Sequence, residues 1–259
     1  MKAERRPQRV FPGRRGSAPT CRRLCDLLVP ATSGGGARED CRVRIGTWNM
    51  EGRWSADHAE LLLAQGCDVW LLTEVHEATQ LPGSAMRLTT GRMGDHKYWA
   101  GVCTRGPLKP FTDPHPASAA VAFHGLVWCS SILPWRSCGD TVWGSGSTAE
   151  KTVRAVAQLM RSLPPGDLVW GGDWNHAMIG REYVGSLPGR AAIDHELTER
   201  RLQLATRHSP HRIPGLLSID HIAVPRVARV LASRRTVAED HGGRRLSDHD
   251  AYTTEIELP

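Results

Sequence analysis

The residues best suited to chemistry in this chain lie in four short polar motifs that border apolar runs. They are Trp48-Asn49-Met50-Glu51, Thr73-Glu74, Gly172-Asp173-Trp174-Asn175 and Ser247-Asp248-His249. Carboxylate and amide oxygens are the ligands that Mg²⁺ prefers in proteins, and Mn²⁺ accepts the same donors. A histidine adds a group that titrates near neutral pH and can move a proton. Together these residue types favour a metal-assisted attack of water on a phosphate ester.

The motif at residues 172–175 carries the sharpest signal. A glycine lets the backbone turn at the end of a strand, and residues two apart project from the same side of an extended chain. Asp173 can therefore bind a metal or take a proton from water, and the Asn175 amide can donate to a phosphate oxygen without adding negative charge. An Asx turn that merely ends the strand explains this tetrapeptide about equally well.

Two pairs of residues extend this set. Glu74 follows an apolar run and suits a Mg²⁺ ligand, while Asn49 could orient that ligand or touch the phosphate. A charged His249 could stabilise the phosphate, with Asp220 as the partner of its ring N–H. Each residue taken singly is more commonly a turn or surface residue, so the hypothesis depends on their occurring together.

The motifs, in this order along the chain, resemble the endonuclease/exonuclease/phosphatase superfamily. That superfamily includes pancreatic-type deoxyribonucleases, abasic-site endonucleases and inositol polyphosphate 5-phosphatases. The resemblance runs from about Arg42 to the C-terminus. It implies an α/β fold, a four-layer sandwich of two packed mixed β-sheets flanked by helices, with the site at one edge where the sheets meet. It also implies Glu74 as the principal metal ligand, with Asn49 close by, and it places Asp248 near the metal or against His249.

One departure from the family pattern concerns the segment from Val127 to Pro134. Many family members have a His or Tyr at the end of this strand, and here there is neither. Ser131 could hydrogen-bond a phosphate oxygen in its place. If the missing group protonates the leaving oxygen, the enzyme would favour good leaving groups, use a metal-bound water instead, or have low activity. Trp174 could stack on a base or a sugar, although core packing is the commoner role of such a tryptophan.

Hydrophobic periodicity predicts the elements that must position these residues. Helices are expected over residues 56–65, 148–163 and 191–206, and strands over residues 43–48, 68–72, 97–104, 119–133, 168–171, 218–224 and 251–258. Strands separated by helices suggest two sheets packed face to face with helices outside.

The N-terminal segment differs in composition from the rest. Residues 1–40 are rich in Arg, Pro and Gly and are predicted to be a disordered basic extension, and residues 41–259 are predicted to form the catalytic domain. Residues 1–41 hold nine Lys/Arg and four Asp/Glu, which accounts for +5 of the net charge of +6. A near-neutral body lacks the strong basic footprint typical of duplex binders. The extension either contacts nucleic acid or has no such role.

The sequence therefore predicts a Mg²⁺-dependent phosphoester hydrolase, most simply a phosphodiesterase or nuclease acting on DNA, RNA or another phosphate ester. The alternative is a catalytically degenerate family member that binds nucleic acid or a protein. Arginines at 226–245 could line a phosphate track or could simply be solvated. No apolar stretch approaches the length of a membrane span. Seven scattered cysteines without a CxxC pair favour a reduced, cytoplasmic protein, and a monomer is expected.

Overall fold

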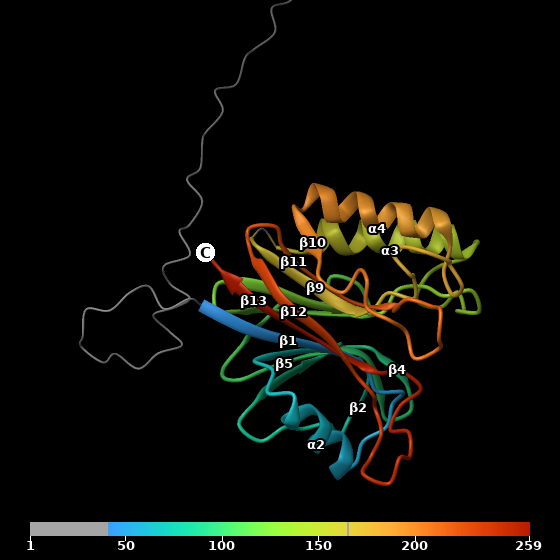
Figure 1. Cartoon of the computed structure of the whole chain (residues 1–259). Helices are drawn as coiled ribbons and strands as arrows, with labels where there is room; N and C mark the ends of the chain where they lie inside the picture. Colours follow the sequence, from blue (N-terminus) through green and yellow to red (C-terminus); the bar gives the residue numbers. More distant parts are fainter. Residues whose placement is uncertain (1–40, 165) are drawn as a thin grey trace, which may run out of the picture.

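Two mixed β-sheets pack face to face in the computed structural model, which describes residues 41–164 and 166–259. Helices cover the outer face of each sheet, so the layers follow the order helix, sheet, sheet, helix (Figure 1). This arrangement confirms the expected four-layer α/β sandwich. The extension predicted over residues 1–40 lies outside the described residues.

The first sheet has seven strands, of which only β1 and β2 run parallel. In spatial order the strands are β12 (Arg229–Thr236), β13 (Ala251–Leu258), β1 (Cys41–Asn49), β2 (Val69–His76), β5 (Lys97–Thr104) and β3 (Ala85–Leu88), with β4 (Arg92–Gly94) also paired to β5. Helix α2 (Ala56–Ala64) connects β1 to β2. Its buried Leu61 and Leu62 belong to the same cluster as Trp48 and Trp70 of the sheet.

The second sheet has six strands, of which only β8 and β9 run parallel. In spatial order they are β10 (Leu202–Leu204), β11 (Asp220–Pro225), β9 (Leu168–Asp173), β8 (Leu126–Ser131), β7 (Ser118–Phe123) and β6 (Lys109–Pro110). Helices α3 (Thr148–Ser162) and α4 (Leu187–Glu199) lie side by side on the outer face (Figure 1). A capping box of Ser147 and Glu150 begins α3, which satisfies two backbone N–H groups that the helix leaves free.

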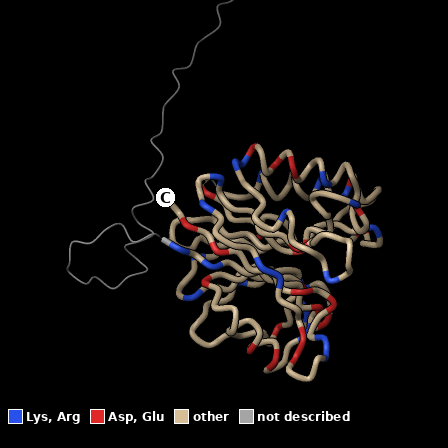
Figure 2. Tube along the Cα trace, viewed as in Figure 1, with Lys and Arg blue, Asp and Glu red and all other residues tan. Residues whose placement is uncertain are grey.

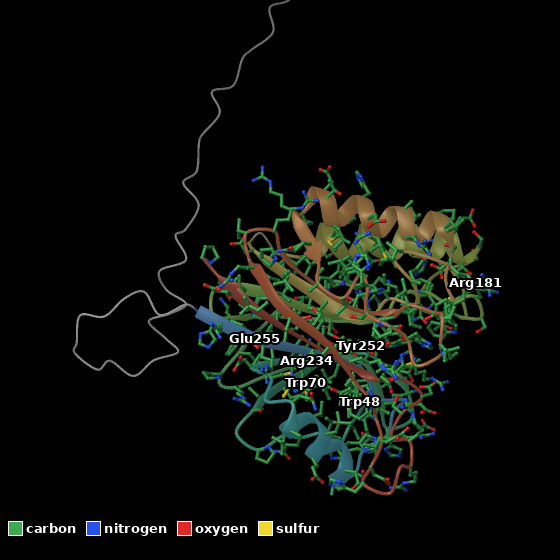
Figure 3. All side chains as sticks on the ribbon, viewed as in Figure 1. Trp48, Trp70, Arg181, Arg234, Tyr252 and Glu255 are labelled. Atoms are coloured by element: carbon green, nitrogen blue, oxygen red, sulfur yellow. The ribbon has the colours of Figure 1, made fainter. Side chains whose placement is uncertain are left out.

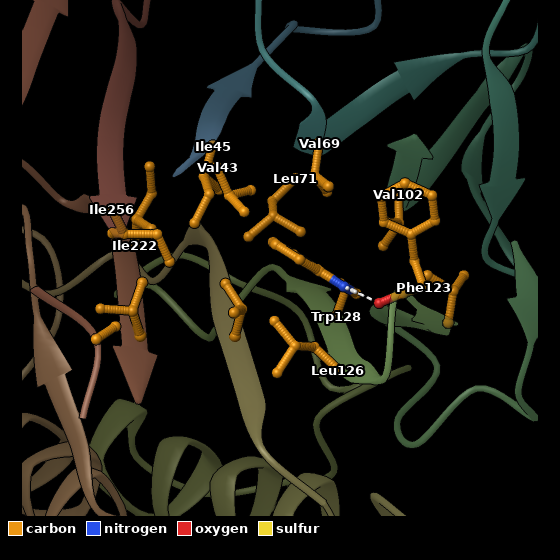
Figure 4. Close-up of a cluster of buried hydrophobic side chains, with 14 of the residues drawn as sticks. Val43, Ile45, Val69, Leu71, Val102, Phe123, Leu126, Trp128, Ile222 and Ile256 are labelled. Carbon is orange, nitrogen blue, oxygen red and sulfur yellow. Dashed lines mark hydrogen bonds between the residues drawn. The ribbon is translucent and has the colours of Figure 1, made fainter. Parts of the chain in front are cut away.

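The core between the sheets consists of aliphatic and aromatic side chains from both inner faces (Figure 4). Ile45 and Leu71 of the first sheet and Val169 and Ile222 of the second are fully buried there. Trp128 adds a large apolar surface, and its indole Nε1 donates to the Phe123 carbonyl at 2.9 Å (dashed line in Figure 4). Because this polar atom is paired, the ring is buried without the cost of a lost hydrogen bond.

Strand register brings the four polar motifs to one edge of the sandwich. Asn49 ends β1 beside Thr73 of the parallel strand β2, so Glu74 is the next residue along. On the second sheet, Asp173 at the end of β9 pairs directly with Asp220 at the start of β11. Strand β13 runs antiparallel to β1 and begins at Ala251, so the segment before it also reaches this edge.

Several sequence-based boundaries differ from the structure. The strand predicted over residues 119–133 is two strands, β7 and β8, because residues 124–125 form a tight turn with positive φ at both positions. The helix predicted over residues 191–206 begins earlier, at a Ser186 cap, and ends at Glu199. Leu202–Leu204 then pairs with β11 instead of continuing the helix. Strand β12 was not predicted, because its arginine-rich sequence has no apolar alternation.

The surface charges match the near-neutral body of the sequence. Acidic and basic residues are interspersed along the trace, as Figure 2 shows. Within residues 41–164 and 166–259, no helix has both the length and the apolar character that crossing a membrane requires. The cysteines Cys67, Cys103 and Cys129 are free and buried, as expected for small core residues.

Candidate active site

The Asn49 side chain joins the two sheets at the common edge. Its Nδ2 atom donates to Asp173 Oδ2 at 2.9 Å and to Glu74 Oε1 at 3.2 Å, and the residue is 1% exposed. Its Oδ1 atom accepts the backbone N–H of Glu51 at 2.9 Å. Asn49 therefore faces Glu74 with its donor and holds two carboxylates in place. The contact with Glu74 is the geometry expected of a residue that orients that carboxylate.

His249 and Asp220 form a hydrogen-bonded pair. His249 Nδ1 donates to Asp220 Oδ2 at 2.8 Å, which leaves Nε2 directed toward Asp173 Oδ2 at 3.9 Å. Asp220 is 1% exposed, and its register partner is Asp173. The sequence-based pairing of Asp220 with the ring of His249 thus matches the geometry.

Burial and the neighbouring charges shift the pKa values of His249 and Asp173. Burial lowers the pKa of His249, but the negative charges of Asp220 and Asp173 outweigh it and raise this pKa to about 10. Burial raises the pKa of Asp173 to about 7, partly countered by the positive charge of His249. At neutral pH the site therefore holds an imidazolium beside a carboxylate poised to exchange a proton.

Ligand atoms of Asp173, Asp220 and His249 lie within 4.8 Å of one another, a spacing that could also hold a metal ion. Within the trio, His249 Nδ1 donates to Asp220 Oδ2 at 2.8 Å, and Nε2 lies 3.9 Å from Asp173 Oδ2, so the same three side chains also have the geometry of an acid–base group. The metal-ligand candidate remains Glu74, on the opposite sheet.

The turn after β9 positions Asp173 and Asn175. The backbone N–H of Asn175 donates to Asp173 Oδ1 at 3.0 Å, and Asn175 Nδ2 donates to the Leu133 carbonyl at 2.9 Å. One Nδ2 hydrogen remains for another acceptor. Gly172 has φ +120, and a Cβ there would collide with the Ser131 backbone of β8. The Asx turn is therefore present, and it serves to fix both side chains at the edge.

The segment before β13 carries His249 into the site through contacts with β1. Ser247 Oγ donates to the Asn49 carbonyl at 2.6 Å, and Trp48 Nε1 donates to the His249 carbonyl at 3.2 Å (Trp48 is labelled in Figure 3). The Asp248 backbone N–H donates to Glu51 Oε2 at 3.0 Å. The Asp248 side chain is 57% exposed, with Oδ1 4.0 Å from His249 Nε2. Of its two expected positions, the structure shows the one against the histidine.

Glu74 suits a divalent cation by its chemistry and by its accessibility. It has a positive φ of 49° within β2, and its side chain is 20% exposed. Its Oε1 accepts from Asn49 and its Oε2 from Lys97 Nζ at 2.6 Å. Each carboxylate oxygen has a second lone pair, so the group retains the hard oxygen donors that Mg²⁺ requires.

Two expected substrate contacts are wrong because the side chains are buried. Trp174 is 0% exposed and packs against Trp170 with ring centroids 4.1 Å apart, so it is a core residue and cannot stack on a substrate. Ser131 is also 0% exposed, and its Oγ accepts the Trp170 indole N–H at 3.0 Å. Neither side chain is accessible from the surface.

Sequence reasoning missed Lys97, and it misjudged part of the arginine-rich region. Lys97 begins β5, opposite His76 of β2, and a lysine at the start of a strand carries no functional signal. Arg235 and Arg245 both pair with the buried Asp250, so they anchor the chain before β13 instead of lining a phosphate track. Arg234 lies on β12 (labelled in Figure 3) and is exposed.

The two packed sheets and the polar cluster at their shared edge are features of α/β sandwiches of the phosphoesterase type. The model of the Endonuclease/Exonuclease/phosphatase family matches residues 46–249. The chain belongs to that family, whose members generally hydrolyse phosphate esters with the help of a divalent metal. No curated protein sequence shows a significant match to the chain.

Solved structures of the family share the fold. An AP endonuclease from Archaeoglobus fulgidus superposes with a TM-score of 0.63 at 15% identity, covering 82% of this chain and 98% of its own. The AP endonuclease LMAP from Leishmania major gives 0.60 at 14% identity, covering 84% and 88%. An endonuclease/exonuclease/phosphatase from Beutenbergia cavernae gives 0.59 at 16%, covering 84% and 72%. At these identities the similarity concerns the fold alone.

Proposed function

We propose that this protein is a Mg²⁺-dependent phosphoester hydrolase, and specifically a phosphodiesterase or nuclease. One observation carries the proposal. A single buried amide, that of Asn49, connects the Glu74 carboxylate of one sheet to the Asp173 carboxylate of the other, and His249 with Asp220 faces Asp173. A cluster that only stabilised the fold would not need both an acid–base pair and a carboxylate able to bind a cation at the same edge.

Each residue has a distinct role in this proposal. Glu74 holds the cation, with Asn49 fixing its orientation, and a bound Mg²⁺ would supply Lewis acidity at the phosphoryl oxygen. Asp173, with its pKa near 7, orients the attacking water and accepts its proton. The imidazolium of His249 stabilises the negative charge that develops on the phosphate, and the remaining N–H of Asn175 donates to a phosphate oxygen. Asp248, at the rim, steers the histidine.

A nucleic acid is the substrate class that the relatives suggest. Two of the structural neighbours are described as AP endonucleases, and another is the endonuclease domain of a telomere-specific retrotransposon. The near-neutral body of this chain favours a short or single-stranded substrate over long duplex DNA. We further propose a cytoplasmic monomer that uses Mg²⁺ in preference to Mn²⁺.

The direct test compares hydrolysis of bis(p-nitrophenyl) phosphate, plasmid DNA and single-stranded DNA by the wild type and by Asp173→Asn. The variant keeps the size of the side chain, and its single amide oxygen can still accept from Asn49 or from the Asn175 N–H. It cannot accept a proton from water. We expect metal-dependent cleavage that the variant loses by a factor of about 100 or more. Equal non-zero turnover in both proteins would remove Asp173 from the reaction. Binding of nucleic acid without cleavage by either protein would instead favour the catalytically inactive binding module.

A further inference from the structure

The candidate metal ligand Glu74 already holds a cation supplied by the chain. Lys97 Nζ lies 2.6 Å from Glu74 Oε2, while Glu74 Oε1 accepts from the Asn49 amide. Both carboxylate oxygens are therefore engaged by side chains of the protein itself. In the nearby ion pair between Arg92 and Glu77 the acidic side chain is 34% exposed, against 20% for Glu74.

Backbone geometry directs the lysine to this carboxylate. Lys97 is the first residue of β5 and pairs with His76, two positions along β2 from Glu74. Its side chain crosses Gly52, where a Cβ would lie 2.5 Å from Lys97 Cδ, and Gly52 has φ +69. The Gly52 backbone N–H in turn donates to the Glu74 carbonyl at 2.8 Å. A glycine at this position thus leaves room for the lysine stem next to the backbone of Glu74.

The ammonium group is nevertheless free to move away. The Lys97 side chain is 26% exposed, and Glu74 is the residue with which it forms an ion pair. A lysine stem is flexible and its ammonium is strongly hydrated, so water can replace the carboxylate as its partner. A divalent cation on the same carboxylate would lie a few ångströms from this positive charge and would be repelled by it.

We propose that Lys97 is a built-in competitor of the divalent metal at Glu74. It neutralises the carboxylate when no metal is bound and gives up Oε2 when the metal arrives, so it sets the metal affinity of the site. The inference rests on the proposed function only in taking Glu74 as the metal ligand. Lys97 is a positioning residue in this scheme, since it acts through Glu74.

The test measures Mn²⁺ binding by isothermal titration calorimetry in the wild type and in Lys97→Met. Methionine preserves the length of the stem over Gly52 and removes the charge. We expect Lys97→Met to bind Mn²⁺ about tenfold more tightly, the size expected for removing one positive charge about 5 Å from a divalent ion in a solvated site. Lys109→Met is the matched control, because Lys109 is exposed on β6 of the other sheet. The Mn²⁺ affinity of the Lys109→Met variant should equal that of the wild type.

A second readout separates competition from a structural role. Without metal, Lys97→Met should unfold at a lower temperature than the wild type, because Glu74 loses its partner. Saturating Mn²⁺ should then raise its melting temperature by more than it raises that of the wild type. An affinity that is unchanged or weaker in Lys97→Met, or absent in both proteins, would overturn the inference. Tighter binding without any phosphoester hydrolysis would leave it standing and would count against the proposed function alone.

Discussion

At the scale of the residue, Asp220 sets the charge of His249. Asp220→Asn removes the negative charge that most strongly raises the histidine pKa, so the imidazolium should be lost at lower pH. In the wild type, the rate should rise as Asp173 loses its proton near pH 7 and fall as His249 loses its proton near pH 10. In the variant the falling limb should move toward pH 7, with a loss of rate of about 100-fold or more at its optimum. The pH–rate profiles of both proteins check this, and an unmoved falling limb would assign Asp220 a structural role.

Residue types at the site were predictable because each motif is short and contiguous. Asn49, Glu74, Asp173 and His249 can all be named from the sequence alone. Which side chains are exposed was not predictable in the same way. Trp174 follows Asp173 in sequence, but it turns into the core against Trp170, and only the packing of the outer helices on the second sheet decides that.

At the scale of the element, the close approach of β8 and β9 fixes the position of Asp173. Gly172→Ala places a methyl group against the Ser131 carbonyl and forces an unfavourable positive φ on alanine. The free energy of unfolding should fall by about 3 kcal/mol or more, because backbone and not a flexible side chain must move. Urea denaturation measures this. Gly139→Ala, with no atom near the added Cβ, is the control, and equal losses in both variants would refute the explanation.

The chain segment before β13 depends on the buried carboxylate of Asp250. Its oxygens pair with Arg235 Nε at 2.9 Å and with Arg245 Nη1 at 2.6 Å, and the side chain is 1% exposed. Asp250→Asn should lower the free energy of unfolding by about 2 kcal/mol, less than for a fully buried pair because both arginines are partly exposed. Glu239→Gln removes an exposed partner of Arg245 and should cost under about 1 kcal/mol. Urea denaturation of the two variants distinguishes them, and equal costs would contradict the role given to Asp250.

Element types were predictable wherever apolar periodicity was strong. Helix α3 matches its prediction to within a residue, since its buried side chains recur at three and four positions. Strand β12 was missed because it is an edge strand whose exposed arginines interrupt any alternation. Its partner β13 supplies the hydrogen bonds that make it a strand, and such long-range pairing leaves no local signal.

At the scale of the whole molecule, residues 41–259 are expected to contain the complete catalytic apparatus. A chain that lacks residues 1–40 should hydrolyse bis(p-nitrophenyl) phosphate at the rate of the full chain, because every proposed site residue lies within residues 41–259. Its affinity for DNA should depend less steeply on salt if the basic extension contacts phosphates. Parallel activity and salt-titration measurements on the two chains check this, and loss of small-substrate hydrolysis would contradict the domain assignment.

The most direct test of the proposed metal site is the Mg²⁺ dependence of bis(p-nitrophenyl) phosphate hydrolysis in the wild type and in Glu74→Gln. If Glu74 holds the cation, the wild-type rate should saturate with Mg²⁺. The variant should then require at least about tenfold more metal for half-maximal rate, because a neutral amide is a weaker ligand for a hard cation. A rate that is independent of Mg²⁺, or an identical metal requirement in both proteins, would contradict the central claim that this edge of the sandwich is a metal-dependent hydrolytic site.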